Sequence, residues 1–419
     1  MALTLVAREK TSDTSSDQSF LTHDEGDATL PEDPDALAEA LAQQAADALT
    51  DGIVQKLSGM ITESLTKAIL EMRRAKSEPS KPIHAFLKGN DAVICAALAS
   101  GCRAFFGYPI TPASEIAHDA MAVLPKVGAI ALQAESEVSA INMLYGAGST
   151  GVPAMTATSG PGFSLMQEGI SYMAAARLPG VIVDVMRSGP GLGNIGPEQG
   201  DYFMATHGGG HGHYHTPVLA PWSVSEMFSM TCRAFDIAFQ FRTPVIVLAD
   251  AFIGQVMETI ELPTELFVTS RDNTWAARPE FPPNTISSLE LSLQKLERLN
   301  DARFSVYEEM RQALPECRIS HVESPKALCI AFGICARIAS EAQSQSGGFD
   351  LFRPLTLWPF PEAELREAAR CSETVLVVEC NRGQMLEDIR RILPDKKILF
   401  LGHDGGVIPT SQEILELIK

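Results

Sequence analysis

The sequence predicts an α/β protein with a parallel sheet, and three observations support this. Three short apolar runs, 104–108, 127–132 and 153–157, end in small, polar or turn-forming residues and are each followed by a segment with helical spacing. Two later runs, 181–186 (VIVDVM) and 243–250 (TPVIVLAD), resemble strands that are buried on both faces. The last hundred residues repeat the alternation of strand and helix on a smaller scale. Such alternation is typical of βαβ units.

Composition and charge indicate which partners and which compartment suit the chain. The chain has 419 residues and a formal net charge of −19, which argues against binding to nucleic acid or to an anionic membrane surface. No apolar run approaches the length of a membrane span, and the start MALTLVAREK lacks the apolar core of a signal peptide. Eight cysteines without a CxxC pair argue against a ferredoxin-type cluster on this chain and favour the cytoplasm.

Five segments are predicted along the chain. Residues 1–33 form an acidic leader that we expect to be disordered, and 34–82 form an amphipathic helical extension with its linker. We expect this helix to pack on its own protein or on a partner subunit in preference to a membrane surface. Residues 86–262 form the first folded domain, 263–318 a linker and helix, and 319–419 a smaller α/β domain.

Polar residues follow the predicted strands of the first domain. They are Thr111, Glu135 and Glu137, the turn 158–162 and Arg187. Because ligands of parallel sheets bind beyond the carboxyl ends of the strands, we expect these residues to form a site. A glutamate there would be partly desolvated and have a raised pKa. An arginine that ends an apolar run is costly unless it pairs with an anion, and its planar guanidinium suits a carboxylate. The combination indicates an acidic substrate.

Glycine and histidine motifs give weaker signals. The turn SGPG at 159–162 fits a phosphate cradle or a tight strand-to-helix turn equally well. The stretch GPGLGNIG at 189–196 contains GxGxxG but opens a long loop late in the domain, so we reject a dinucleotide site. Histidines at 207, 211, 213 and 215 lack the partners of a zinc site, which favours a gating or substrate-lining loop.

Several motifs together resemble one enzyme family. They are GYPITPASEI, LQAESEVSAINMLYGA, TATSGPGFSLMQEGISY, LPGVIVDVMRSGPGLGNI, GGGHGHYHTPVLAP, RTPVIVLAD, RPLTLWPFP and VVECNRGQMLEDIR. From about Leu87 onward the chain resembles the alpha subunit of 2-oxoacid:ferredoxin oxidoreductases, most closely the branched-chain (2-oxoisovalerate) type and relatives such as phenylglyoxylate oxidoreductase. The resemblance implies the pyrimidine-binding domain of thiamine diphosphate enzymes, followed by a transketolase C-terminal-like domain. The first 85 residues have no counterpart in short alpha subunits.

The resemblance also implies cofactors and partners. Thiamine diphosphate with Mg²⁺ would be shared with a beta subunit that holds the diphosphate. Coenzyme A would be the co-substrate, and [4Fe-4S] clusters would lie on partner subunits. The expected partners are the beta subunit, a gamma subunit and a ferredoxin-like subunit, with a flavin subunit for NAD left open. Neither nucleic acid nor a membrane span is expected.

Residue roles follow from the same resemblance. Glu137 would hydrogen-bond N1′ of the aminopyrimidine, with Glu135 as the alternative, while Thr111 and Arg187 would hold the carboxylate and oxo group of the substrate. No metal ligand is expected on this chain. The other expected cofactor contacts are Pro109, Ile110, Thr158, Ser159 and Gly160, and the expected substrate loop comprises Tyr108, Ser188, His211 and His213.

The substrate stays open between 2-oxoisovalerate and a bulkier acid such as phenylglyoxylate. Ser188 stands where the family has glycine, and His213 stands where aspartate is common in GHGDY. 2-Oxoglutarate is disfavoured because no second basic residue is clearly placed for its distal carboxylate. Two rival functions remain at this stage, an iron-free transketolase-like transferase and a non-catalytic assembly subunit.

Overall fold

The computed structural model describes residues 83–263, 271–277 and 284–418, all of which belong to one compact unit, Gly59–Lys419. The predicted acidic leader and amphipathic extension lie outside the described residues. Within the described ranges, no helix is both long enough and apolar enough to cross a membrane.

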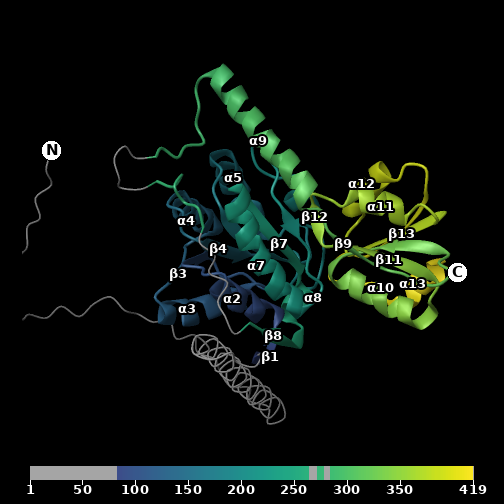
Figure 1. Cartoon of the computed structure of the whole chain (residues 1–419). Helices are drawn as coiled ribbons and strands as arrows, with labels where there is room; N and C mark the ends of the chain where they lie inside the picture. The colour runs from purple at the N-terminus through teal and green to yellow at the C-terminus, as the bar shows by residue number, and fades with distance from the viewer. Residues whose placement is uncertain (1–82, 264–270, 278–283, 419) are drawn as a thin grey trace, which may run out of the picture. The chain divides into compact units, whose positions relative to one another are not determined.

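A seven-stranded sheet forms the first half of the described chain (Figure 1). Its strands are parallel except for one antiparallel pair at an edge, β12 with β6, so the predicted α/β class with a parallel sheet is confirmed. In spatial order the strands are β12 (Thr356–Trp358), β6 (Val218–Leu219), β7 (Pro244–Asp250), β5 (Gly180–Met186), β4 (Ala154–Thr158), β2 (Ala104–Gly107) and β3 (Ile130–Gln133).

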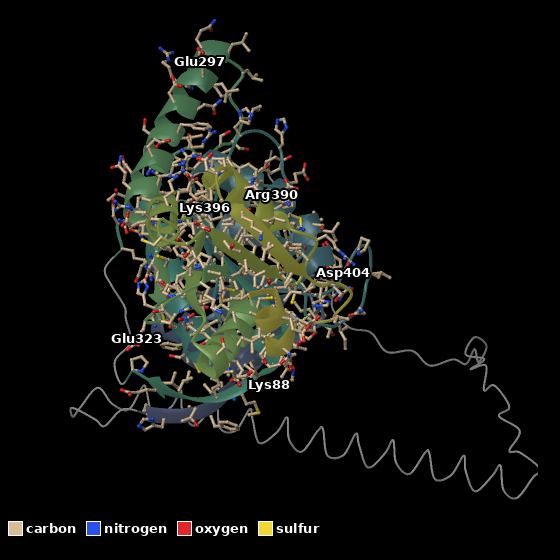
Figure 2. All side chains as sticks on the ribbon, turned by 90° about the vertical axis from the view of Figure 1, so that its right-hand side faces the viewer. Lys88, Glu297, Glu323, Arg390, Lys396 and Asp404 are labelled. Atoms are coloured by element: carbon tan, nitrogen blue, oxygen red, sulfur yellow. The ribbon has the colours of Figure 1, made fainter. Side chains whose placement is uncertain are left out.

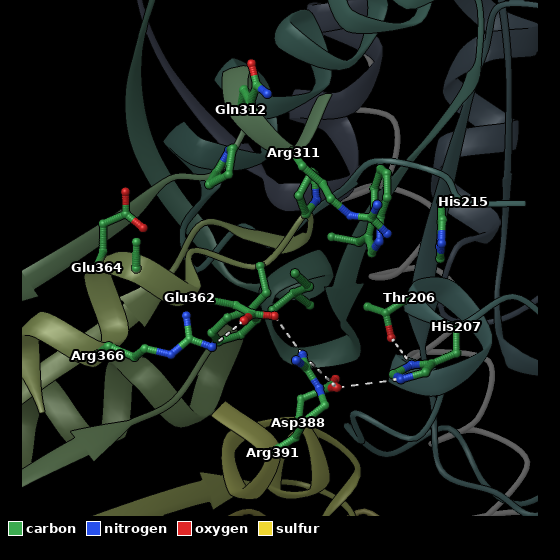
Figure 3. A pocket seen from close by; sticks show the side chains of 16 residues that line it. Thr206, His207, His215, Arg311, Gln312, Glu362, Glu364, Arg366, Asp388 and Arg391 are labelled. Atoms are coloured by element: carbon green, nitrogen blue, oxygen red, sulfur yellow. Dashed lines mark hydrogen bonds and ion pairs between the residues drawn. The ribbon is translucent and has the colours of Figure 1, made fainter. Parts of the chain in front are cut away.

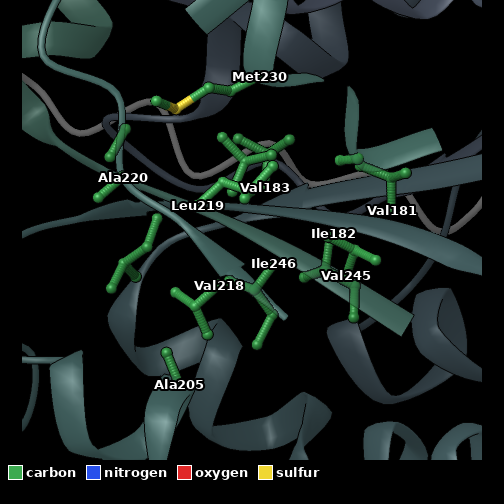
Figure 4. Packing of buried hydrophobic residues seen from close by; sticks show 14 of the residues in the cluster. Val181, Ile182, Val183, Ala205, Val218, Leu219, Ala220, Met230, Val245 and Ile246 are labelled. Carbon is green, nitrogen blue, oxygen red and sulfur yellow. The ribbon is translucent and has the colours of Figure 1, made fainter. Parts of the chain in front are cut away.

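The two central strands carry the core. Every residue of β5 and β7 is buried, and Val181, Ile182, Val245 and Ile246 interlock with their neighbours in Figure 4. Continuous apolar runs predicted strands that are covered on both faces, and that prediction holds. The helices of this half are α2 (Gly89–Ala99), α3 (Ser114–Val123), α4 (Glu137–Ser149), α5 (Gly160–Ala176), α6 (Tyr202–Thr206), α7 (Val224–Phe241) and α8 (Ala251–Gln255).

A two-stranded sheet joins the segment before α2 to the end of the first half. Strand β1 (Ile83–Lys88) pairs antiparallel with β8 (Met257–Leu262). Ala85 and Leu87 of β1 are buried, whereas His84 and Phe86 are exposed, which is the alternation of a half-buried strand. The partner strand lies about 170 residues later in the chain, so only the alternation in IHAFLK could have indicated β1.

A five-stranded sheet forms the second half. Its four parallel strands are joined by one antiparallel edge strand, β9. The spatial order is β14 (Lys397–Gly402), β13 (Thr374–Glu379), β10 (Ala327–Ile330), β11 (Phe349–Pro354) and β9 (Cys317–Ser320), with helices α10 (Gly333–Ser346), α11 (Glu362–Ala368), α12 (Gln384–Ile392) and α13 (Ser411–Ile418).

Helix α9 (Leu293–Ala313) connects the two halves and is mostly exposed, with Tyr307 and Met310 as its buried residues. Glu297, near the N-terminus of this helix, lies apart from the bulk of the side chains in Figure 2. The helix begins at Leu293, within the predicted linker and helix of 263–318, and Leu289 and Leu291 precede it as exposed side chains.

The extended run 349–358 is divided between the two sheets. Strand β11 stays in the five-stranded sheet, whereas β12 joins the seven-stranded sheet. Two hydrogen bonds hold the bend between them, from the backbone N–H groups of Leu355 and Thr356 to the carbonyl oxygen of Glu316, at 2.9 and 3.2 Å. The second half thereby contributes a strand to the first.

A buried ion pair fastens the same junction. Both terminal nitrogens of Arg353, in β11, donate to the two carboxylate oxygens of Glu226, in α7, at 2.6 and 2.7 Å. The guanidinium also lies 4.0 Å from the centre of the Trp222 ring. Arg353 is 2% exposed, so this pair is shielded from water and from screening by salt.

We predict that Arg353→Leu lowers the free energy of unfolding by about 3–5 kcal/mol, because it leaves the Glu226 carboxylate buried without its partner. Urea unfolding of both chains measures the difference. The matched control is Arg370→Leu, which removes an ion pair with Glu367 whose side chains are both about three-quarters exposed, and which should leave the midpoint nearly unchanged. Equal midpoints for the two variants would show that the buried pair does not fasten the junction.

Candidate functional site at the carboxyl ends of β2 to β5

The sheet reverses its direction of growth at β2. From β2 the chain adds β3 on one side and then β4 on the other, so β2 lies between them. Ligands of open α/β sheets bind in the crevice outside the carboxyl ends at such a reversal. The segments after β3, β2, β4 and β5, which are four adjacent strands, carry the site residues that the sequence predicted.

Glu137 is the first residue of α4 and is 5% exposed. Ser136 caps this helix, because its hydroxyl accepts a hydrogen bond from the Ser139 N–H at 3.2 Å. The Glu137 carboxylate lies against the first turn of α5. A Cβ on Gly162 would stand 2.4 Å from Oε1 of Glu137 and 2.2 Å from the Thr158 hydroxyl. Among the described residues no hydrogen-bond partner of this carboxylate is found, so its oxygens remain available to a ligand.

Glu135 has a different environment. Its side chain is exposed and accepts a hydrogen bond from the Ser139 hydroxyl at 2.5 Å. That hydrogen bond lowers the pKa of Glu135, so the predicted rise through desolvation is wrong for this residue. The physical reason is its position, because Glu135 precedes the helix and faces water, whereas Glu137 enters the helix on its buried side.

Arg187 directly follows β5 and connects three segments. Its terminal nitrogens donate to the carbonyl oxygens of Thr111, at 2.9 Å, and Leu192, at 3.0 Å. The side chain of Thr111 itself is exposed. The Arg187 Nε is buried and has no partner among the described residues. Burial raises the pKa of Asp201, which lies in the same region, and the nearby charge of Arg187 partly offsets that rise. Arg187 therefore fixes the segment that follows β2 to the loop that follows β5.

That loop makes a tight turn between Ser188 and Gly196. The buried Ser188 accepts a hydrogen bond from the Asn194 N–H at 3.1 Å through its carbonyl, and its hydroxyl donates to the Gly196 carbonyl at 3.2 Å. Gly193 has φ +55°, and a Cβ there would stand 1.6 Å from the Ser188 carbonyl oxygen. The glycines of GPGLGNIG are thus explained by a turn, in agreement with the rejection of a dinucleotide site.

The SGPG segment is also explained by a turn. Thr158 ends β4, Ser159 follows it, and α5 begins at Gly160. Thr158 and Ser159 are fully buried, and the Ser159 hydroxyl has no partner among the described residues. A Cβ on Gly160 would lie 3.3 Å from a carboxylate oxygen of Asp201. Carboxylates approach this first turn at Gly160 and Gly162, which favours the turn over the phosphate cradle.

The histidines of the long loop have separate environments. His211 and His213 are exposed, whereas the His215 ring stacks on Trp358 with centroids 4.7 Å apart. A ring nitrogen of His207 lies 2.9 Å from the Thr206 hydroxyl. Within the described residues, no group of three or more histidine, cysteine, aspartate or glutamate side chains has the arrangement of a metal site.

A cavity of about 640 Å³ lies elsewhere, at the end of α9 beside β12, α11 and α12 (Figure 3). Its charged side chains are largely paired with one another. Glu362 accepts hydrogen bonds from both Arg366 and Arg391, at 2.8 Å each, and Arg391 lies 3.7 Å from Asp388. His207 and His215 of the histidine-rich loop line this cavity, but none of the site residues predicted at the strand ends does. We therefore place the functional site at the strand ends.

Comparison with known proteins identifies the family. Residues 95–322 match the family described as pyruvate flavodoxin/ferredoxin oxidoreductase, thiamine diphosphate-binding, and residues 326–414 match pyruvate:ferredoxin oxidoreductase core domain II. The chain belongs to the 2-oxoacid:ferredoxin oxidoreductases. The resemblance seen in the motifs is confirmed, as is the fold class with a thiamine diphosphate-binding domain first.

Individual relatives support the same family assignment. The chain is 44% identical over 339 residues to ketoisovalerate oxidoreductase subunit VorB of Methanothermobacter thermautotrophicus, covering 80% of this chain and 96% of that protein. It is 38% identical over 321 residues to 2-oxoglutarate synthase subunit KorA of Archaeoglobus fulgidus, covering 73% and 90%.

A solved structure, 2-oxoglutarate:ferredoxin oxidoreductase from Magnetococcus marinus with 2-oxoglutarate, coenzyme A and succinyl-CoA bound, superimposes with a TM-score of 0.73 at 29% identity. The match covers 82% of this chain, which spans 65% of the length of that one.

The site residues of this oxidoreductase subunit fit the aminopyrimidine end of thiamine diphosphate. That end requires a carboxylate that is shielded from water and not already engaged. Glu137 meets both conditions, and the absence of a side chain at Gly162 makes room for it. The first turn of α5, by contrast, faces carboxylates and offers no basic group for a diphosphate.

Sequence reasoning missed three acids of this region. Asp184 lies in the middle of β5, Glu198 accepts a hydrogen bond from the Gly189 N–H at 2.8 Å, and Asp201 precedes α6. Burial raises the pKa of all three side chains. The signal for Asp184 was present as a single acid inside the apolar run VIVDVM.

We predict that Gly162→Ala displaces Glu137 and the Thr158 hydroxyl and lowers thiamine-dependent activity at least tenfold, because its Cβ would overlap both groups. Steady-state kinetics of the assembled enzyme measure the loss. Gly146→Ala in α4 is the control, since a Cβ there meets nothing within 4 Å. Unchanged activity in the Gly162 variant would show that Glu137 does not need its present position.

Proposed function

We propose that this chain supplies the aminopyrimidine-binding half of a thiamine diphosphate site. The assembled enzyme would oxidatively decarboxylate an apolar 2-oxo acid with coenzyme A, giving an acyl-CoA and CO₂ and reducing ferredoxin. The observation that carries the proposal is the Glu137 carboxylate, buried, without a described partner, and placed at the carboxyl ends of the strands.

Glu137 would share a proton with N1′ of the aminopyrimidine. When bound, thiamine diphosphate supplies a carbon nucleophile that adds to the 2-oxo group and an electron sink that takes up the charge left by CO₂. A hydrogen bond to a carboxylate is stronger in a water-poor site than in water, because water does not compete for it. The buried position of Glu137 therefore suits a proton-sharing role, and the exposed position of Glu135 does not.

Exposed apolar side chains on β3, α4 and α5 support a partner subunit. Ile130 and Leu132 lie on β3, Val138 follows Glu137 in α4, and Leu165 lies on α5, all with substantial exposure. β3 is also an edge strand, with one side unpaired in the sheet. A surface with these features is typical of a protein interface. We propose that a beta subunit covers it and holds the diphosphate and Mg²⁺.

The remaining partners are proposed from the family. A gamma subunit and a ferredoxin-like subunit would carry the electrons away through [4Fe-4S] clusters, and the terminal acceptor would be ferredoxin, or NAD if a flavin subunit is present. The eight cysteines of this chain are free thiols, and a reducing compartment such as the cytoplasm would keep them so.

The substrate would be held at Arg187 and Thr111. We propose that the guanidinium and the exposed hydroxyl bind the carboxylate and oxo group, and that the exposed Leu192 and Ile195 face an apolar side chain. The nearby Arg382 would suit a distal carboxylate, but Asp404 already engages it at 2.6 and 2.9 Å. This arrangement favours 2-oxoisovalerate or phenylglyoxylate over 2-oxoglutarate, in line with the higher identity to the ketoisovalerate relatives.

Glu137→Gln should lower the turnover of the assembled enzyme by about 10²–10⁴-fold, the range for loss of a positioned proton-transfer group. Glu135→Gln is the matched control and should leave turnover within about twofold, because its carboxylate faces water. Reconstitution of each variant with thiamine diphosphate and substrate measures both. Equal activity of the two variants would contradict the assignment, and a loss confined to Glu135 would transfer the role to that residue.

Substrate class and electron transfer are tested on the intact complex, purified without oxygen through a tag on this chain. We expect bound iron, co-purifying subunits, and reduction of ferredoxin that depends on coenzyme A, with kcat/KM for 2-oxoisovalerate or phenylglyoxylate at least tenfold above that for 2-oxoglutarate. Preference for 2-oxoglutarate would contradict the proposed side-chain site. Turnover by an iron-free preparation would replace the oxidoreductase with a transferase.

A further inference from the structure

Two aspartates meet close to the first turn of α5 and have no part in the proposed chemistry. Asp184 lies in the centre of β5 and is fully buried, and Asp201 immediately precedes α6. Both carboxylate oxygens of Asp184, and Oδ2 of Asp201, are shielded from water and accept no hydrogen bond from any described residue. The two carboxyl groups are instead within hydrogen-bonding reach of each other.

Two carboxyl groups in such surroundings cannot both be charged. Burial, reinforced by the neighbouring acid, raises the pKa of Asp184 well above its usual range. Burial also raises the pKa of Asp201, to about 6. A hydrogen bond between two carboxyl groups needs one proton between them, as in other buried carboxyl pairs.

The surroundings of the pair contain few other charges. Glu198 raises and Arg187 lowers the pKa of Asp201. The residues opposite Asp184 in the neighbouring strands are Thr158 in β4 and Leu248 in β7, neither of them charged. Asp250, also in β7, accepts hydrogen bonds from the Ile253 and Ile334 N–H groups and is engaged there, and α5 presents Gly160.

The first turn of α5 contacts this pair and Glu137. A Cβ on Gly160 would stand 3.3 Å from Asp201, and one on Gly162 would stand 2.4 Å from Glu137. We propose that Asp184 and Asp201 share one proton and together position the first turn of α5 against Glu137. The positioning role of the pair rests on the proposed function of Glu137. The shared proton is independent of that function.

Loss of the shared proton has a definite consequence. With both carboxyl groups charged, like charges would lie in contact without a donor, and Asp201 would move from its place beside Gly160. The turn and Glu137 would shift with it, so turnover falls at alkaline pH while substrate binding at Arg187 is retained. The pair therefore acts as a positioning element whose effect appears in kcat rather than in KM.

The raised pKa values make the folded state less stable as pH rises. For a carboxyl group whose folded-state pKa is raised, the contribution to stability is complete below the unfolded pKa, about 3.9, and declines as pH rises toward the folded pKa. The folding equilibrium loses up to about tenfold per pH unit in that window. Replacing one acid by asparagine removes this decline and supplies an amide that donates to the remaining carboxylate.

The experiment compares D184N with the unmodified chain in the assembled enzyme. Thermal unfolding and steady-state kinetics are recorded across pH 5 to 9. We expect the unfolding midpoint of D184N to fall less with rising pH, and the alkaline decline of kcat to move to higher pH by about one unit or more, with KM unchanged. D201N serves as the reciprocal variant, because it also leaves one charged and one neutral group, and it decides the question if D184N fails to fold.

D119N is the matched control. Asp119 forms a second buried carboxyl pair, with Asp91, between α2 and α3, and its pKa is raised by burial to about 8. This replacement should flatten the dependence of stability on pH without moving the pH profile of kcat, because the pair lies on α2 and α3 and not beside the first turn of α5.

Each outcome of these experiments tests a separate part of the proposal. Unchanged slopes of stability against pH in D184N and D201N would overturn the shared proton. If D184N and D201N flatten the slope of stability against pH but have the same pH profile of kcat as D119N, the positioning role is overturned and the shared proton is retained. Absence of 2-oxo acid oxidation in the unmodified complex would refute the proposed function, while the unfolding data would still establish or overturn the shared proton.

Discussion

The close approach of side chains to the first turn of α5 is the constraint on which the site depends. Gly160 and Gly162 have no side chains, so Asp201 and Glu137 reach positions that a methyl group would occupy or crowd. The Glu137 carboxylate would otherwise be pushed toward water, where solvent would compete for its hydrogen bonds. The glycines of SGPG therefore act through the space they leave, and the sequence motif alone could not separate this from an anion cradle.

Much of the fold could be predicted from sequence because strands buried on both faces leave continuous apolar runs. β2, β4, β5 and β7 were found in this way, with small differences in their ends. β3 begins at Ile130, later than predicted, because a short 3₁₀ turn occupies Leu124–Val127. β1 and the separate placement of β12 could not be predicted, because they depend on pairing with strands far away in the sequence.

The candidate site was predictable to a similar extent. The order of strands brings the segments after β2 to β5 together, so position in the alternating pattern was sufficient to nominate Glu137, Thr111 and Arg187. What the pattern could not show is which side of a chain faces the interior. Glu135 and Glu137 differ by two residues, and the start of α4 between them decides that one is exposed and the other buried. Asp184 was overlooked for the opposite reason, because an apolar run was taken to be core throughout.

The second half of the chain has its physical role in holding the loop that carries Asp201. The Gln199 side chain donates to the Phe332 carbonyl at 2.9 Å and accepts from the Cys380 N–H at 3.0 Å. The Asn381 side chain donates to the Gln199 carbonyl at 2.9 Å.

Glu379 supports that arrangement from within, since it accepts hydrogen bonds from Asn381 and from the Met385 and Leu386 N–H groups at the start of α12. The motif VVECNRGQMLEDIR, which helped to reveal the family, is thus explained by a rigid contact with the loop of the first half. Because several hydrogen bonds to different elements fix Gln199, the position of Asp201 two residues later is set by the second sheet as much as by the first. The two halves cannot be treated as independent, since Gln384 at the start of α12 bonds to Gly200 and Phe203 on either side of Asp201, and a change in the packing of α12 would therefore move the loop that carries Asp201.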